Sequence, residues 1–197
     1  TMQPIFPKDH PMLETILNFL QKQLANQLAS RLSSNLPLVT LSNLTKLDGS
    51  PVTELDNTLV LTLLNVEKEA AAPTVGYGYS PSQIAPPLHL NLDVLVSAAC
   101  TRYPDALTLL SQALGFFQST PYFTPETAAD WPAGVARLSI ELKSLSLQDM
   151  NNLWGMLGAK YQPSVVYKVR MLSVQESQPR RQTPDVSAPD VNVGRAS

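Results

Sequence analysis

Stretches in which apolar and polar residues alternate one by one constrain this chain most. In residues 88–96 (LHLNLDVLV) the apolar set occupies every second position, and residues 135–145 repeat the pattern. Because successive side chains of a strand point to opposite faces, such runs predict strands with one buried face and one partly wet face, as antiparallel sheets allow. We expect Leu138, Ile140 and Leu142 to be buried. Further strand candidates are residues 38–44 (LVTLSNL), 58–67 and 164–171.

Three segments carry the three- and four-residue spacing of amphipathic helices. The first runs from residue 12 to 32, and the second begins near Pro104, a favoured first-turn residue, and continues to Phe117. The third lies between Ser146 and Gly158. Ser146 and Asp149 have the spacing of a capping box, and Gly158 stands where a left-handed cap is wanted. Together with the strands, these helices predict an α+β domain in which two to three helices pack on a twisted, mainly antiparallel sheet of about five strands.

The run from 151 to 172, NNLWGMLGAKYQPSVVYKVRML, joins the third helix to the last strand. We interpret its aromatic and glycine residues as structural. The apolar face of the helix includes Trp154, and Gly155 costs roughly 1 kcal/mol relative to Ala, which suggests that another backbone crosses close by. We expect the whole motif to serve packing rather than bond-making. Its members are Trp154, Gly155, Gly158, Tyr161, Pro163 and Tyr167.

Two cations of the last strand, Lys168 and Arg170, share the face opposite Tyr167. We expect this strand to lie at an edge or on the surface of the sheet. The two side chains then form either an ordinary charged outer face or a docking strip for an acidic partner. The residues alone leave both possibilities open.

Extended segments flank and interrupt the predicted domain. Residues 1–11 contain three prolines and read as an arm, and residues 69–87 form a long loop rich in Pro, Gly and Tyr. The loop's GYGY element, with Tyr77 and Tyr79, lacks the spacing and the lysine of a phosphate-binding loop, so contact with a partner is favoured. In the tail, residues 175–197, Val191 and Val193 could add an edge strand to a partner's sheet.

Composition and motifs argue against several classes of function. Fourteen basic and sixteen acidic residues give a net charge of −2, which is unlike a nucleic-acid-binding protein. No apolar stretch approaches the ~20 residues that span a bilayer, so membrane insertion is not expected. The single Cys100 cannot form an internal disulfide, which favours synthesis in a reducing cytoplasm. His10 and His89 have no partner at metal-ligand spacing, and no nucleophile elbow is present. We therefore assign no catalytic, metal or cofactor-binding residue.

Four segments together resemble a known family. They are FLQKQLANQL (19–28), LHLNLDVLVSAA (88–99), YPDALTLLSQALGFFQSTPYFTP (103–125) and the run from 151 to 172. This combination is similar to the tail caps, or tail terminators, of extracellular contractile injection systems, the phage-tail-like particles that include antifeeding prophages and virulence cassettes. The resemblance covers residues 12–174, and the last segment is its most specific part.

The resemblance implies a non-enzymatic structural protein made in the bacterial cytoplasm and built into a particle that can be released. It implies a ring, expected to be a hexamer, that closes the distal end of an inner tube and a contractile sheath, with tube and sheath proteins as partners. The expected organisation is an arm (1–11), a cap domain (12–174) and a flexible arm (175–197). A non-catalytic adaptor for the baseplate or cargo is the alternative, and a small hydrolase with the 69–87 loop as a lid is less favoured.

Overall fold

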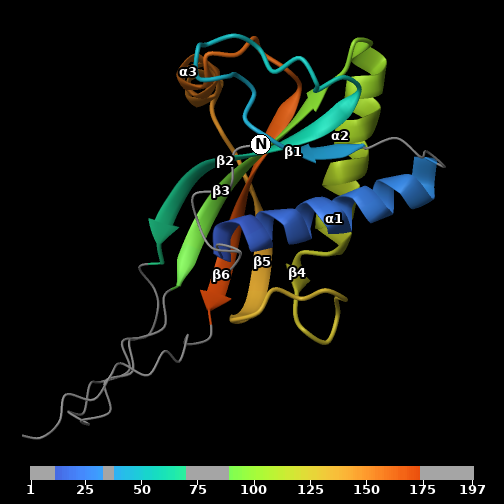
Figure 1. The fold of residues 1–197 in the computed structure, drawn as a ribbon, viewed down its shortest axis with the longest axis vertical. Helices are drawn as coiled ribbons and strands as arrows, with labels where there is room; N and C mark the ends of the chain where they lie inside the picture. The colour runs from blue at the N-terminus through green and yellow to red at the C-terminus, as the bar shows by residue number, and fades with distance from the viewer. Residues whose placement is uncertain (1–11, 33–37, 70–88, 174–197) are drawn as a thin grey trace, which may run out of the picture.

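A computed structural model describes residues 12–32, 38–69 and 89–173. These residues form three helices and six strands, which Figure 1 labels. In chain order they are α1 Met12–Leu32, β1 Val39–Leu41, β2 Thr58–Lys68, β3 Leu90–Ala99, α2 Tyr103–Ser119, β4 Tyr122–Phe123, β5 Val135–Lys143, α3 Leu147–Leu157 and β6 Ser164–Ser173. The expected α+β architecture is confirmed, and helices α1 and α3 match their predicted spans closely.

The six strands form one sheet in the order β1-β2-β3-β6-β5-β4. All neighbouring strands are antiparallel except β1 and β2, which are parallel. The strand that sequence reasoning missed is β4, which pairs only Tyr122 and Phe123 with β5. Of the two places expected for the last strand, an edge or the surface, the edge is wrong, because β6 stands between β3 and β5.

The main core lies between one face of the sheet and helices α1 and α2. Apolar side chains from β2, β3, β5 and β6 meet the buried stripe of α1 and the buried residues of α2. Figure 1 shows α1 lying across the sheet, with α2 standing beside it. Aromatic rings close one end of this core, where the Phe19 ring meets Phe123 and Trp131 edge-on at centroid distances of 5.4 and 5.3 Å.

A smaller core occupies part of the opposite face. Here α3 and the segment between β1 and β2 cover Val60, Leu95 and Val166 of the sheet. The Thr45 hydroxyl donates a hydrogen bond of 3.1 Å to the Leu157 carbonyl and ties that segment to the end of α3. In Figure 1, α3 and the segment between β1 and β2 lie together at the top. The second face of the sheet is therefore covered at this end by α3.

Two predictions of burial are wrong. The second face of β3 is not wet: Asn91 and Asp93 are 5% and 6% exposed, and Leu95 is fully buried. The strand is central, so its side chains are flanked on both sides, and Leu95 lies under the α3 layer. Conversely, Leu142 is 55% exposed, although it follows the alternation of its strand. Alternation fixes which face a side chain takes, but not whether another element covers it there.

Candidate interaction surfaces

The α3-to-β6 connection is built around a buried tryptophan. Trp154 is 5% exposed and packs in the smaller core, and its ring meets that of Tyr161 edge-on at 5.5 Å. Ser146 and Asp149 form the predicted capping box, and Gly158 ends the helix in the left-handed region at φ 63°. The Pro163 carbonyl accepts from Ala98 N at 2.9 Å, which sets β6 beside β3.

The explanation offered for Gly155 is wrong. A Cβ placed on this glycine meets no heavy atom within 4 Å, so no described backbone crosses there. Tyr167 lies on the other face of the sheet, in the main core, where its ring packs on Phe117 at 4.8 Å. Burial raises the pKa of its hydroxyl to about 12. Tyr167 is therefore a residue of the main core. It is close to Trp154 in the sequence but does not pack with it.

The part of the second face that no described helix covers carries charged and polar side chains from four neighbouring strands, which we call the polar strip. Lys143 Nζ lies 2.8 Å from Asp93 Oδ2, Arg170 Nη2 lies 3.3 Å from Glu141 Oε2, and Lys168 Nζ lies 3.9 Å from Glu67 Oε2. Its members are Glu67, Asn91, Asp93, Glu141, Lys143, Lys168 and Arg170.

Each predicted docking cation thus already faces a carboxylate of its own sheet. Lys168 and Arg170 sit on a central strand, and β2 and β5 supply their partners. The strip contains three acidic and three basic side chains, so it presents no surplus of positive charge to an acidic partner. Sequence reasoning missed Asn91, Asp93, Glu141 and Lys143 as members. The polar positions of β3 and β5 alternate visibly, but only the strand order places them beside β6.

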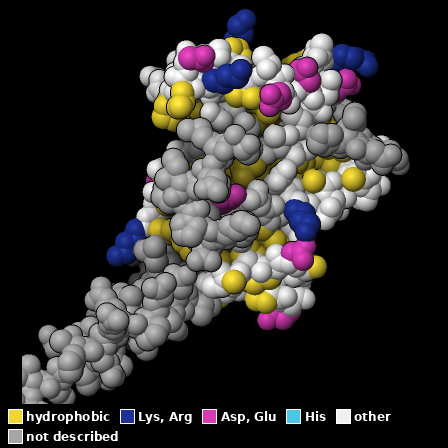
Figure 2. Space-filling view, viewed as in Figure 1, with side chains coloured by type: hydrophobic (Ala, Val, Ile, Leu, Met, Phe, Trp, Pro, Cys, Tyr) yellow, Lys and Arg dark blue, Asp and Glu magenta, His cyan; other side chains and the backbone are white. Residues whose placement is uncertain are grey.

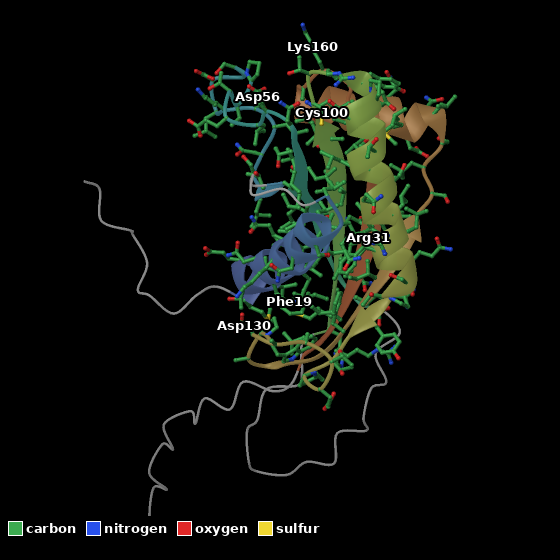
Figure 3. The ribbon with its side chains drawn as sticks, turned by 90° about the vertical axis from the view of Figure 1, so that its right-hand side faces the viewer. Phe19, Arg31, Asp56, Cys100, Asp130 and Lys160 are labelled. Carbon is green, nitrogen blue, oxygen red and sulfur yellow. The ribbon has the colours of Figure 1, made fainter. Side chains whose placement is uncertain are left out.

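A hollow of about 650 Å³ opens at the α3 end of the molecule. It lies between the β1–β2 segment, the start of α2 and the α3–β6 turn; Figure 3 shows Asp56, Cys100 and Lys160 together there. Two largely exposed tyrosines, Tyr103 and Tyr161, also line it. Burial, followed by the charge of Asp105, raises the pKa of the Cys100 thiol, which keeps the thiol protonated at neutral pH.

The surface around this end mixes charge types. In the view of Figure 2, Lys and Arg side chains alternate there with Asp and Glu and with apolar patches. Within the described residues, no three His, Cys, Asp or Glu side chains gather as a metal site, and no described helix is long and apolar enough to cross a bilayer. Four predicted contact residues, Tyr77, Tyr79, Val191 and Val193, lie outside the described residues.

Comparison with known proteins places the chain in a family. The model of the Pvc16 N-terminal domain family matches residues 12–188, and the chain belongs to that family. No curated protein sequence matches significantly. The fold is similar to the sheath/tube terminator of the PVC extracellular contractile injection system in its extended state, with a TM-score of 0.52 and 17% identity over 92% of this chain and 64% of that one.

A second solved structure has the same fold. The tube-terminating cap of the anti-feeding prophage matches with a TM-score of 0.52 and 16% identity, over 90% of this chain and 60% of that one. The chain therefore spans less than two thirds of the length of both structures. The resemblance to tail terminators that the sequence suggested is confirmed at the level of family and fold.

Proposed function

We propose that this member of the Pvc16 N-terminal domain family is a structural cap that ends the inner tube and the contractile sheath of a phage-tail-like injection system. The observation that carries the proposal is the shared fold: two solved structures described as a sheath/tube terminator and a tube-terminating cap match over 92% and 90% of this chain. The partners would be a tube protein, a sheath protein and further copies of this chain. The particle would be assembled in a bacterial cytoplasm and could be released.

A non-enzymatic role agrees with the chemistry of the described surfaces. The cations and carboxylates of the polar strip face one another, and the one thiol at the hollow has a raised pKa. Such groups stabilise a surface rather than activate a nucleophile, since a catalytic cysteine needs a lowered pKa. These features favour a building block over a hydrolase.

A ring, expected to be a hexamer, requires two different surfaces that fit each other, because closed rings form through head-to-tail contacts. Two surfaces at the α3 end lie apart across the sheet. The hollow adjoins the β1–β2 segment, whereas Leu147, which is 91% exposed, stands at the start of α3, just after β5. The strand order separates β5 from β2 by two strands. This arrangement suits a contact in which Leu147 of one copy meets the hollow of the next.

Electron microscopy of particles from cells that lack this gene tests the capping role. Tails of uncontrolled length, or unstable tails, restored to normal by the intact gene, are the expected result. Normal, stable tails in its absence would contradict the proposal. A reconstruction of the distal end with twofold or threefold symmetry would contradict the hexamer alone.

The ring contact has its own matched pair of variants. Leu147→Glu should weaken ring formation on particles, because it puts a charge into an apolar contact. Gln148→Glu adds the same charge to the next exposed position of α3 and should leave the ring intact. Equal behaviour of the two variants would exclude Leu147 as the contact.

A further inference from the structure

The outer edge of β2 is open over its second half. β1 pairs with residues 59–61 of β2, and no described residue bonds to the outer backbone edge of residues 63–68. The Glu69 amide donates to the His89 carbonyl at 2.9 Å, on the β3 side, so the backbone groups of Val66 and Lys68, an odd number of residues away, point outward. The side chain of Val66 is 40% exposed. An open edge of this kind is a template for another strand.

The outer edge of β5 is open beyond β4. β4 pairs with residues 138–139, the Ile140 amide donates to the Pro121 carbonyl at 2.8 Å, and no described residue bonds to this edge further along. Because the Ile140 amide points outward, the backbone groups of Leu142, two residues on, point outward too. Leu142 pairs with Tyr167 of the main core and is 55% exposed. Its side chain therefore lies half uncovered on the main-core face.

The two open edges fit each other. Val66 pairs with Leu92 of the main core, so Val66 and Leu142 lie on the same face of the sheet. β2 and β5 run in opposite directions, because β2, β3, β6 and β5 are successively antiparallel. A second copy beside the first, with its sheet facing the same way, brings its β2 antiparallel to β5. We propose that the β5 edge of one copy pairs with the β2 edge of the next, an inference that rests on the ring of the proposed function.

Charge selects the register of this pairing. If Val66 stood directly opposite Leu142, Glu67 would stand opposite Glu141 on the polar face, and like charges directly opposite destabilise a sheet. A shift of two residues removes this repulsion and keeps Val66 on the diagonal of Leu142, within reach of a side-chain contact. The opposed pairs are then Lys68 with Leu142 and Glu67 with Lys143.

The shifted register also suits a closed ring. Within one copy, Leu142 is level with Tyr167 and Val94, whereas Lys68 is level with Leu90, four residues away on β3. Each copy is thus displaced by about 13 Å along the strands, while its strands β2, β3, β6 and β5 span roughly 19 Å across the sheet. The strand tilt that follows is about 35°, a value at which sheets close into barrels.

Cysteine cross-linking of particles, and of the concentrated purified chain, tests the edge contact. In a Cys100→Ser background, which removes the only native cysteine, Lys68→Cys combined with Leu142→Cys puts thiols on a hydrogen-bonded pair with Cα atoms about 5.5 Å apart, within disulfide range. Within one copy β2 and β5 stand three strand spacings apart, roughly 14 Å, so the bond forms only between copies. Mild oxidation should convert the monomer band into a ladder of linked multimers in a non-reducing gel, and reduction should reverse it.

Val66→Cys combined with Leu142→Cys is the matched control, because it fits the rejected register. All three substituted side chains are exposed, so the variants should fold like the parent, which circular dichroism checks. The control and the single-cysteine variants should stay monomeric in the gel. No ladder from the Lys68 and Leu142 pair in either sample, or an equal ladder from the control, would overturn the proposal. Normal tails in cells that lack the gene, together with a ladder from the purified chain, would refute the cap and support the edge contact.

Discussion

Replacing Trp154 with alanine should lower the free energy of unfolding by about 3 kcal/mol. A buried tryptophan removes roughly 150–250 Å² from water, which corresponds to about 4–6 kcal/mol at ~25 cal/mol per Å². Trp154 is 5% exposed, so nearly all of this applies. Its Nε1 has no acceptor within the described residues, and loss of that unpaired donor offsets about 1–3 kcal/mol. The net value falls at the lower end of the range for Trp→Ala in cores, ~3–5 kcal/mol.

Urea unfolding followed by far-ultraviolet circular dichroism measures this loss, since the variant removes one of only two tryptophan fluorophores. The midpoint should fall with an unchanged slope, and the melting temperature should drop by about 6–12 °C. Leu147→Ala is the matched control on the same helix; this leucine is 91% exposed and should cost less than ~0.5 kcal/mol. If the two variants lost the same small amount, Trp154 would not be a core residue. Unchanged stability with lost binding to particles would make it a docking residue.

Three further predictions concern the same region and the main core. Gly155→Ala should raise the free energy of unfolding by about 0.5–1 kcal/mol in thermal melts, since its added Cβ meets nothing within 4 Å, whereas Gly158→Ala at φ 63° should lower it by about 1 kcal/mol. Ser146→Ala should cost about 1 kcal/mol by removing the capping box, and Ser144→Ala should cost nothing measurable. The raised pKa of Tyr167, about 12, means that the unfolded chain loses this proton near pH 10 before the folded chain does. Its contribution is complete below pH 10 and should fall by about 2 kcal/mol between pH 10 and 12, a loss that Tyr167→Phe should abolish in urea titrations.

Local signals carried most of the fold prediction. The capping box of Ser146 and Asp149, the left-handed Gly158 and the apolar stripe of α1 each depend on residues a few positions apart, and the structure confirms all three. Alternation likewise located β3, β5 and β6 to within a few residues, and β2 falls on the predicted 58–67 segment. These features need no knowledge of what packs against them.

The predictions that failed concern residues whose partners lie far away in the sequence. Lys168 and Arg170 give β6 the half-polar pattern of an edge strand, yet β3 and β5 flank it, and carboxylates of β2 and β5 pair with its two cations. Asp93 meets Lys143 from fifty residues away, so neither residue stood out alone. Leu142 follows the apolar–polar alternation of its strand, but no described layer covers it. The polar strip could therefore not be predicted from local patterns.

The position of β6 also determines when the sheet can be completed during synthesis. Strands β1 to β3 leave the ribosome first and β4 and β5 follow, but these two groups have no pairing with each other until β6 enters between them. Contacts of such large sequence separation, as between Val94 and Tyr167, close late and slowly. A chain interrupted before residue 164 would hold two unjoined half-sheets with open edges. Only polypeptides translated through the last strand can therefore form the complete six-stranded sheet.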